Sequence, residues 1–184
     1  LRFSKGDYRT AQAAFQAAIA ANDRNEEAQF GLARCLEKLG DHAGAERNYE
    51  RALEINPRHA QSLNGLALIV GGQGQIEKAR SLLERAIELE PEYVEAHNNL
   101  GLLYQALRRD ADAEAQFEIA AQLRPGDAMM QLNLGALYLR KRRGVEARAA
   151  LERALALDPK QAFAHFNLAV LYTDVVPDRA KAVE

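Results

Sequence analysis

Apolar residues recur along the chain at the spacing of amphipathic helices, in stretches of about fourteen residues. Short polar turns separate these stretches, for example LGDH at residues 39–42 and GQGQ at 72–75. The pattern predicts pairs of helices joined into hairpins, and therefore an all-α fold.

A strict period of 34 residues organises these helices. Four prolines follow one another at this interval, and each is preceded by an alanine five residues earlier. The prolines are Pro57, Pro91, Pro125 and Pro159, and the alanines are Ala52, Ala86, Ala120 and Ala154. Because proline lacks an amide hydrogen and restricts the residue before it, each proline is expected to end the second helix of a hairpin. A degenerate earlier copy has Ala18 in the alanine position and Asp23 in place of proline.

Further columns share this period. The first helix carries a leucine followed by a small residue, at Leu32–Ala33, Leu66–Ala67, Leu100–Gly101, Leu134–Gly135 and Leu168–Ala169. The second helix carries an alanine and, four residues later, a large apolar residue: Ala11 and Phe15, Ala45 and Tyr49, Ala79 and Leu83, Ala113 and Phe117, Ala147 and Leu151. One hairpin cannot bury such a stripe alone, so neighbouring hairpins are expected to stack.

The combined pattern, L-[GA]-x-x-Y, then A-x-x-x-[FYL]-x-x-A and a proline, resembles the tetratricopeptide repeat family. The segments NLGLLY (99–104), NLGALY (133–138) and NLAVLY (167–172) carry the resemblance. It implies a right-handed α-α superhelix, a solenoid of stacked 34-residue helical hairpins. The expected single array over 1–184 comprises a partial repeat 1–25, full repeats 26–59, 60–93, 94–127 and 128–161, and a partial repeat 162–184.

Two departures from the pattern are local. Leu36 and Val70 stand where later repeats have tyrosine, and TDVVPDRAKAVE (173–184) indicates a turn that is one residue longer than its counterparts. Because the chain begins at Leu1 and stops at Glu184 inside an expected helix, we expect it to be a fragment of a longer protein.

The resemblance implies that the first helices line a concave ligand face. The sixth position of each repeat holds Gly31, Gly65, Asn99, Asn133 and Asn167, and Asn98 borders this position. An asparagine side chain offers an acceptor and two donors, so the predicted ladder of amides can pair with the main chain of an extended peptide. The alternative is that these amides face water or cap nearby backbone groups.

The last two repeats are unusually apolar at neighbouring positions of the first helix. The residues are Met129, Leu132 and Ala136, then Phe163, Phe166 and Val170. Contiguous exposed apolar area usually marks an interaction surface, so we expect an apolar patch that binds a partner. There are two alternatives: the continuation of the chain covers the patch, or the protein self-associates through its terminal repeats.

Binding of a chaperone C-terminal tail is not expected. Family members that hold such tails use lysine, asparagine and arginine at five first-helix positions. In the window that starts at residue 60 these positions hold Asn64, Leu68, Asn99, Met129 and Asn133, of which only Asn99 matches. Windows that start at 26 and 94 also lack the cations that a carboxylate requires.

Charge and hydropathy exclude other classes of partner. The 184 residues are 48% hydrophobic and 27% charged, with a formal net charge of -2, which disfavours a nucleic-acid binder. No run of about eighteen apolar residues exists, so no membrane span is predicted. The basic segment LRKRRG (139–144) is interpreted as a solvated turn, and docking of an acidic partner or nucleic acid is its alternative.

Catalytic signals are absent from the sequence. The four histidines are scattered, and His97 and His165, which share a position, lie two repeats apart, so no metal site is expected. GGQGQ (71–75) lacks the spacing of a phosphate-binding loop. Cys35 is expected to be a buried thiol. We therefore predict no enzyme activity and no cofactor.

Three functions follow from these observations. The leading prediction is a scaffold that holds a partner polypeptide through Asn98, Asn99, Asn133 and Asn167 and through an apolar patch of Met129, Leu132, Phe163, Phe166 and Val170. The second is the substrate-docking arm of a larger enzyme such as a glycosyltransferase. The third is a module that joins copies of the protein into an oligomer.

Overall fold

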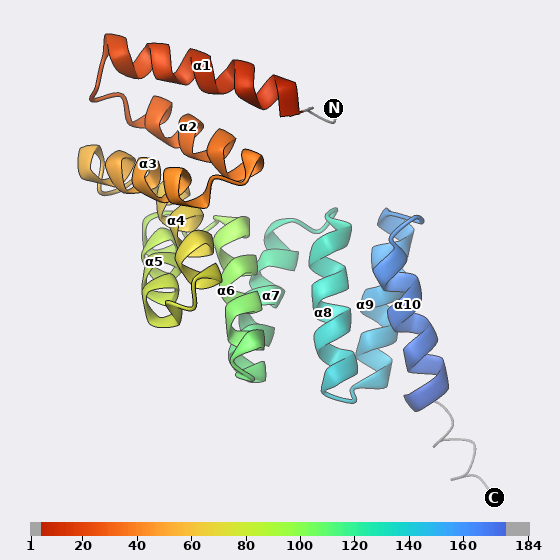
Figure 1. Cartoon of the computed structure of the whole chain (residues 1–184). Helices are drawn as coiled ribbons and strands as arrows, with labels where there is room; N and C mark the ends of the chain where they lie inside the picture. The colour runs from red at the N-terminus through yellow and green to blue at the C-terminus, as the bar shows by residue number, and fades with distance from the viewer. Residues whose placement is uncertain (1–4, 176–184) are drawn as a thin grey trace, which may run out of the picture. The chain divides into compact units, whose positions relative to one another are not determined.

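The structure, a computed structural model, describes residues 5–175, with side chains for residues 6–173. All regular structure in this range is helical (Figure 1). The helices are α1 (Lys5–Ala21), α2 (Glu26–Leu39), α3 (His42–Ile55), α4 (Ala60–Gly72), α5 (Ile76–Leu89), α6 (Val94–Ala106), α7 (Asp110–Leu123), α8 (Ala128–Arg140), α9 (Gly144–Leu157) and α10 (Ala162–Val170), followed by a short π-helix, η1 (Leu171–Val175). The predicted all-α class is confirmed.

The helix boundaries follow the 34-residue period. The first helices α2, α4, α6, α8 and α10 begin at residues 26, 60, 94, 128 and 162. Each second helix from α3 to α9 ends two residues before the proline of its repeat, as the missing proline amide requires. The predicted hairpins are therefore present throughout residues 26–157.

The chain divides into two compact units, residues 1–99 and 100–184, and the division falls within α6. In the first unit α1 packs on α2, α2 on α3, α3 on α4 and α4 on α5, and the first helices α2 and α4 also touch (Figure 1). In the second unit α7 packs on α8, α8 on α9 and α9 on α10, and the first helices α8 and α10 touch. Each unit is thus a stack in which neighbouring hairpins complete one another's core. The extent of one array over the whole chain stays a prediction.

The core consists of the columns that the sequence pattern identified. In all four full repeats the two alanines of the second helix and the large residue between them are at most 2% exposed. These residues are Ala45, Tyr49 and Ala52; Ala79, Leu83 and Ala86; Ala113, Phe117 and Ala120; and Ala147, Leu151 and Ala154. Burial of each large side chain is worth about 1.5 to 3 kcal/mol, and it is possible only because the next hairpin covers it.

Glycines allow the first helices to approach these large side chains, but the two units place the glycine differently. In the first unit Gly31 lies against the ring of Phe15 and Gly65 against the ring of Tyr49, each from the preceding repeat. In the second unit Gly135 lies against Leu151 of its own repeat. A Cβ atom at any of these glycines would come within 2.4 to 2.6 Å of a side-chain atom.

Several helices begin with a side chain that caps the backbone. Asn25 accepts a hydrogen bond from the amide of Ala28 at 3.0 Å, and Asp41 accepts one from Gly44 at 2.8 Å. At α4 the cap is His59, whose Nδ1 accepts from the Ser62 amide at 3.2 Å while its Nε2 lies 3.3 Å from a carboxylate oxygen of Glu27. The cap of α4 therefore also contacts the preceding repeat, because Glu27 belongs to α2.

The turns after α2, α4, α6 and α8 each contain a left-handed residue at the same place in the period. Gly40 and Gly74 adopt φ values of 87° and 82°, and Arg108 and Arg142 adopt 60° and 56°. Glycine accepts this conformation without strain, whereas a side chain with a Cβ atom does not. The two arginine turns therefore carry a local cost that the two glycine turns avoid.

The predicted longer turn near the C-terminus and the second helix of the last repeat lie outside the described residues. Within the described part, α10 continues into η1, where the hydroxyl of Thr173 donates to the carbonyl oxygens of Ala169 and Val170. The first helix of this repeat is therefore one turn of α-helix shorter than α8 and ends in wider π geometry.

Candidate functional site

The first helices of the first unit are joined by a pair of asparagine amides. The amide nitrogen of Asn99 in α6 donates a hydrogen bond of 2.8 Å to the side-chain oxygen of Asn64 in α4. Asn64 is only 8% exposed, and Asn99 is half-buried. A buried amide needs such a partner to avoid a large desolvation cost. At least one of the predicted ladder residues therefore also ties two neighbouring repeats together.

A tyrosine and an arginine lie beside this pair. Asn64 is hydrogen-bonded to the side chain of Tyr93, and burial, with the nearby carboxylates of Glu95 and Glu90, raises the pKa of Tyr93 to about 12. Arg34 is close enough to oppose that shift, and its guanidinium carbon lies 5.7 Å from the centre of the Phe30 ring. This part of the surface therefore combines hydrogen-bonding side chains, one exposed cation and aromatic area.

The remaining asparagines of the ladder lie on the predicted helices and are half-buried. Asn98 is on α6, Asn133 on α8 and Asn167 on α10. In the first unit the equivalent sixth positions are Gly31 and Gly65, which contact the second helix of the preceding repeat. The sixth position is therefore also an inter-repeat contact there, a role that the sequence pattern did not reveal.

The apolar patch of the last two repeats is exposed in part. Phe163 and Phe166 on α10 are 70% and 64% exposed, Met129 on α8 is 45% exposed, and Val170 is half-buried. The expectation that Leu132 contributes exposed area is wrong, because Leu132 is 5% exposed and packs with Leu151, Ala154 and Ala164 in the core. The exposed part of the patch therefore consists chiefly of two phenylalanines and one methionine.

Two leucines that were not chosen from the sequence are also exposed. Leu102 on α6 is 42% exposed, and Leu68 on α4, in the other unit, is 46% exposed. Both occupy the ninth position of their repeat, which is the position of Val170 in α10. The common position was visible in the sequence, but exposure at this position could not be ranked without the structure.

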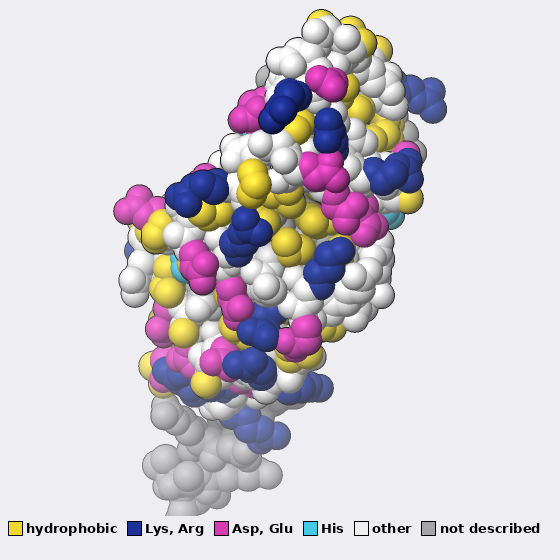
Figure 2. Space-filling model, turned by 90° about the vertical axis from the view of Figure 1, so that its left-hand side faces the viewer, with side chains coloured by type: hydrophobic (Ala, Val, Ile, Leu, Met, Phe, Trp, Pro, Cys, Tyr) yellow, Lys and Arg dark blue, Asp and Glu magenta, His cyan; other side chains and the backbone are white. Residues whose placement is uncertain are grey.

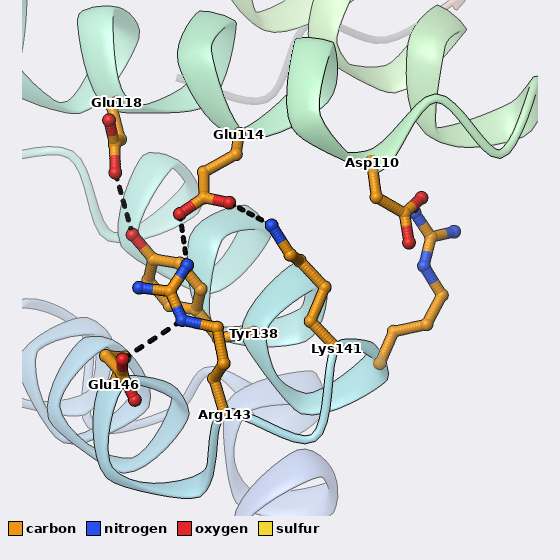
Figure 3. Close-up of polar contacts among 8 residues, drawn as sticks. Asp110, Glu114, Glu118, Tyr138, Lys141, Arg143 and Glu146 are labelled. Carbon is orange, nitrogen blue, oxygen red and sulfur yellow. Dashed lines mark hydrogen bonds and ion pairs between the residues drawn. The ribbon is translucent and has the colours of Figure 1, made fainter.

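The basic turn after α8 is an ion-paired contact between helices (Figure 3). Arg140 pairs with Asp110, and Lys141 and Arg143 both pair with Glu114, so three cations of α8 and its turn meet carboxylates of α7. Arg143 also pairs with Glu146 of α9 at 3.0 Å. The interpretation of this segment as a solvated turn is therefore wrong for these three cations, whereas Arg142 is exposed.

Tyr138 completes this network. Its hydroxyl donates to Glu118 at 3.0 Å, and the guanidinium carbon of Arg143 lies 4.6 Å from the ring centre (Figure 3). Burial, together with Glu118, raises the pKa of Tyr138 to about 12. In the same way, the guanidinium carbon of Arg109 lies 4.5 Å from the ring centre of Tyr104. In both repeats the tyrosine of the repeat pattern therefore makes a cation–π contact with the arginine of the following turn.

The other candidate groups show no arrangement for chemistry. Cys35 is buried, as expected, and burial raises the pKa of its thiol. In the part of the chain that the structure describes, no three histidine, cysteine, aspartate or glutamate side chains gather to hold a metal ion. Figure 2 shows that cations and carboxylates are interspersed over one face, rather than collected into a field of one sign.

Comparison with sequence families identifies the family to which the chain belongs. Models described as tetratricopeptide repeat match residues 24–92, 64–128 and 104–162. The chain belongs to the tetratricopeptide repeat family. No curated protein sequence matches it.

Solved structures agree with the tetratricopeptide repeat assignment. TTC0263, a thermophilic tetratricopeptide repeat protein of Thermus thermophilus, is 29% identical, covers 91% of this chain and 91% of its own, and superposes with a TM-score of 0.74. PilF of Pseudomonas aeruginosa is 24% identical, with coverages of 97% and 81% and a TM-score of 0.83. MamA is 24% identical, with coverages of 86% and 92% and a TM-score of 0.72. The last two likenesses concern the fold alone.

Membership of the tetratricopeptide repeat family gives the general role. Chains of this family are scaffolds for protein interaction, generally without catalytic activity, and they typically bind protein partners. No helix within residues 5–175 is long and apolar enough to cross a membrane. The surfaces described above are therefore candidates for contact with a polypeptide.

Proposed function

We propose that this chain is a scaffold that holds an extended segment of a partner polypeptide on its first helices. The apolar patch of α8 and α10 would receive apolar side chains, and the amides of Asn133 and Asn167 would pair with the partner's main chain. In the first unit, Asn98 and Asn99 would act in the same way beside Tyr93. The proposal concerns each unit by itself.

The observation that carries this proposal is the exposure of Phe163 and Phe166. They are three residues apart on α10 and therefore lie on one side of the helix, and Asn167 is four residues after Phe163. Two large aromatic side chains in water on one helix side are uncommon on a surface without a partner. Their burial by a ligand is worth about 1.5 to 3 kcal/mol each before the costs of ordering.

Amides complement such a patch. A peptide that inserts apolar side chains must also bring its backbone N–H and C=O groups out of water, and each needs a hydrogen-bond partner. The side chain of an asparagine can serve either group, because it both donates and accepts. The combination of aromatic side chains and amides on α10 therefore suits a peptide whose backbone is extended and whose side chains are apolar at intervals.

A library of displayed linear peptides tests this proposal without knowledge of the natural partner. The wild-type chain should enrich peptides with spaced apolar residues, and the double variant Phe163→Ala, Phe166→Ala should bind the enriched peptides at least about tenfold more weakly. Val145→Ala is the matched control, because Val145 is 64% exposed but lies on the second helix α9. Equal affinity of wild type and double variant would refute the assignment.

The same samples separate self-association from partner binding. If the phenylalanines join copies of the protein, sedimentation velocity should show a concentration-dependent increase in mass for wild type and none for the double variant. A wild-type chain that remains monomeric while it binds selected peptides supports the scaffold. A chain that only self-associates contradicts it.

A further inference from the structure

Two exposed arginines have a backbone conformation for which the earlier repeats use glycine. Gly40 and Gly74 adopt a positive φ in the turns after α2 and α4, whereas Arg108 and Arg142 adopt it after α6 and α8. A residue with a Cβ atom is strained there, and the glycine turns show that this strain is avoidable. Avoidable backbone strain is characteristic of residues that serve a function.

The turns that contain these two arginines are held together in the second unit. Arg140, at the end of α8, donates a hydrogen bond of 3.2 Å to the main-chain oxygen of Gln105 and pairs with Asp110. Gln105 precedes the turn of Arg108, and Asp110 follows it. Arg140 itself directly precedes the turn of Arg142. Both exposed arginines therefore belong to one edge of the second unit.

Arg108 and Arg142 differ from the other cations of this edge, because no carboxylate neutralises them. The neighbouring cations all pair with carboxylates of α7 or α9; they are Arg109, Arg140, Lys141 and Arg143. Among the described residues, neither Arg108 nor Arg142 takes part in an ion pair. The edge therefore presents two positive charges that the fold itself does not use.

The chemistry of these two side chains suits carboxylates. A guanidinium group binds a carboxylate through two parallel hydrogen bonds, which fixes the geometry as well as the charge. Helices in contact lie about 8 to 10 Å apart, and an extended chain advances about 3.3 Å per residue. Two acidic residues that are two or three positions apart in an extended segment would therefore reach Arg108 and Arg142 together.

The surroundings of the two arginines favour an acidic polypeptide over a nucleic acid. The first turns of α7 carry the carboxylates of Asp110, Asp112 and Glu114, which would repel a continuous phosphate backbone. The nearby rings of Tyr104 and Tyr138 already lie against arginine side chains, so they offer little surface on which bases could stack. The formal net charge of -2 points in the same direction.

From these observations we infer that Arg108 and Arg142 bind an acidic segment of a partner polypeptide. The segment is extended and carries carboxylates two or three residues apart. The inference accounts for the strained turns, because glycine at either position would remove the cation. The site lies on the turns that follow α6 and α8 and does not depend on the first-helix face proposed above.

A pair of synthetic peptides tests this inference. The probe repeats the unit Gly-Ser-Glu, is blocked at both ends and carries a fluorophore, and its control repeats Gly-Ser-Gln. Fluorescence polarisation at low ionic strength measures binding of each peptide to the whole chain. The glutamate peptide should bind at least about fivefold more tightly than the glutamine peptide, and added salt should weaken its binding.

The double variant Arg108→Gly, Arg142→Gly removes both cations and both strained conformations. It should bind the glutamate peptide at least about fivefold more weakly, although thermal unfolding should show a fold as stable as that of wild type. Weaker binding by a chain of undiminished stability cannot result from misfolding. Arg153→Ala, Lys160→Ala is the matched control, because it removes two exposed cations elsewhere in the same unit and should leave binding unchanged.

Three outcomes would overturn the inference: equal affinity for the glutamate and glutamine peptides, unchanged binding by the double glycine variant, or the same loss in the matched control. A single-stranded oligothymidine tests the class of ligand. If it binds more tightly than the glutamate peptide and the glycine variant abolishes this, the ligand is a nucleic acid and the assignment to a polypeptide is wrong. Phe163→Ala, Phe166→Ala should bind the glutamate peptide normally, so failure of the first-helix proposal is distinguishable.

Discussion

The side-chain oxygen of Asn64 accepts a hydrogen bond of 2.8 Å from the amide of Asn99, 35 residues later in the next first helix. The pair lies where a ladder of amides was predicted to bind a ligand. The hydrogen bond links two neighbouring repeats, so its contribution to the free energy of unfolding can be measured separately from any contribution to ligand binding.

The first prediction concerns this pair. Asn64→Ala should lower the free energy of unfolding by about 1 to 2 kcal/mol, because it leaves the Asn99 amide without its acceptor in a half-buried place. Asn99→Ala should cost about 0.5 to 1.5 kcal/mol, since the remaining amide of Asn64 keeps its contact with Tyr93. Urea unfolding of both single variants and the double variant measures the coupling. Strictly additive losses would mean that the hydrogen bond contributes nothing.

The second prediction concerns pH. Burial raises the pKa of Glu114, but the hydrogen bonds and charges of Lys141 and Arg143 outweigh this and hold the pKa below its usual value. A carboxylate whose pKa is lower in the folded state stabilises the fold above its unfolded pKa, and this contribution is lost as the pH falls through the folded pKa. Stability should therefore decrease as the pH falls from about 5 to about 3.

The variant Glu114→Gln separates this carboxylate from the others. At neutral pH it should lose about 1 to 2 kcal/mol, because Lys141 loses its carboxylate partner and Arg143 loses one of its two, and its unfolding free energy should fall less steeply with acid than that of wild type. Glu92→Gln is the control, since Glu92 is exposed and is not a member of the ion pairs of Glu114. Parallel pH curves for wild type and Glu114→Gln would contradict the role of Glu114.

The third prediction uses the left-handed turns. Arg142→Gly should raise the free energy of unfolding by about 0.5 to 1 kcal/mol, because glycine adopts a positive φ without strain. Gly74→Ala, at the equivalent turn, should lower it by a similar amount, since nothing crowds the added Cβ atom and only its backbone preference changes. Thermal unfolding measures both. A lower melting temperature for Arg142→Gly would show that the arginine side chain contributes more than its strain costs.

The fourth prediction tests close packing. Gly135→Ala places a Cβ atom about 2.6 Å from Leu151 and should cost about 1 to 3 kcal/mol. Shortening the opposing side chain in Gly135→Ala, Leu151→Val should recover part of this loss, although Leu151→Val alone is destabilising. Chemical unfolding of the three variants measures their free energies of unfolding. If the double variant loses more stability than the two single variants together, the cost of Gly135→Ala is not steric.

The sequence predicted the parts of this fold that local rules determine. Pro57 and its counterparts end helices because proline lacks an amide hydrogen, which does not depend on any other part of the chain. Tyr49 and Leu83 occupy the same position of their repeats because stacking creates the same environment every 34 residues. Exposure depends on neighbours and was harder to predict. Leu132 and Phe166 occupy the same position of their repeats, yet Leu132 is buried because Ala164 and Leu168 of α10 pack with its cluster.

Charged residues show the same limit. The run from Arg140 to Arg143 suggested a solvated turn because each cation was considered alone. Asp110 and Glu114, some 30 residues earlier, lie on the helix beside it and pair with three of the four cations. Long side chains reach between repeats, so a pattern within one repeat does not reveal their partners.

The position of the close-approach glycine limits how the repeats can be recombined. In residues 26–93 the small residue that admits a large neighbour is Gly31 or Gly65, and it serves the preceding repeat, whereas Gly101 and Gly135 serve their own. If a later repeat replaced the one that follows Tyr49, its sixth position would be asparagine instead of glycine. The asparagine side chain would then clash with the Tyr49 ring, which lies directly against the backbone of Gly65. Modules with the same length and the same signature are thus not interchangeable, and a chimera of this protein must exchange each repeat together with the helix before it.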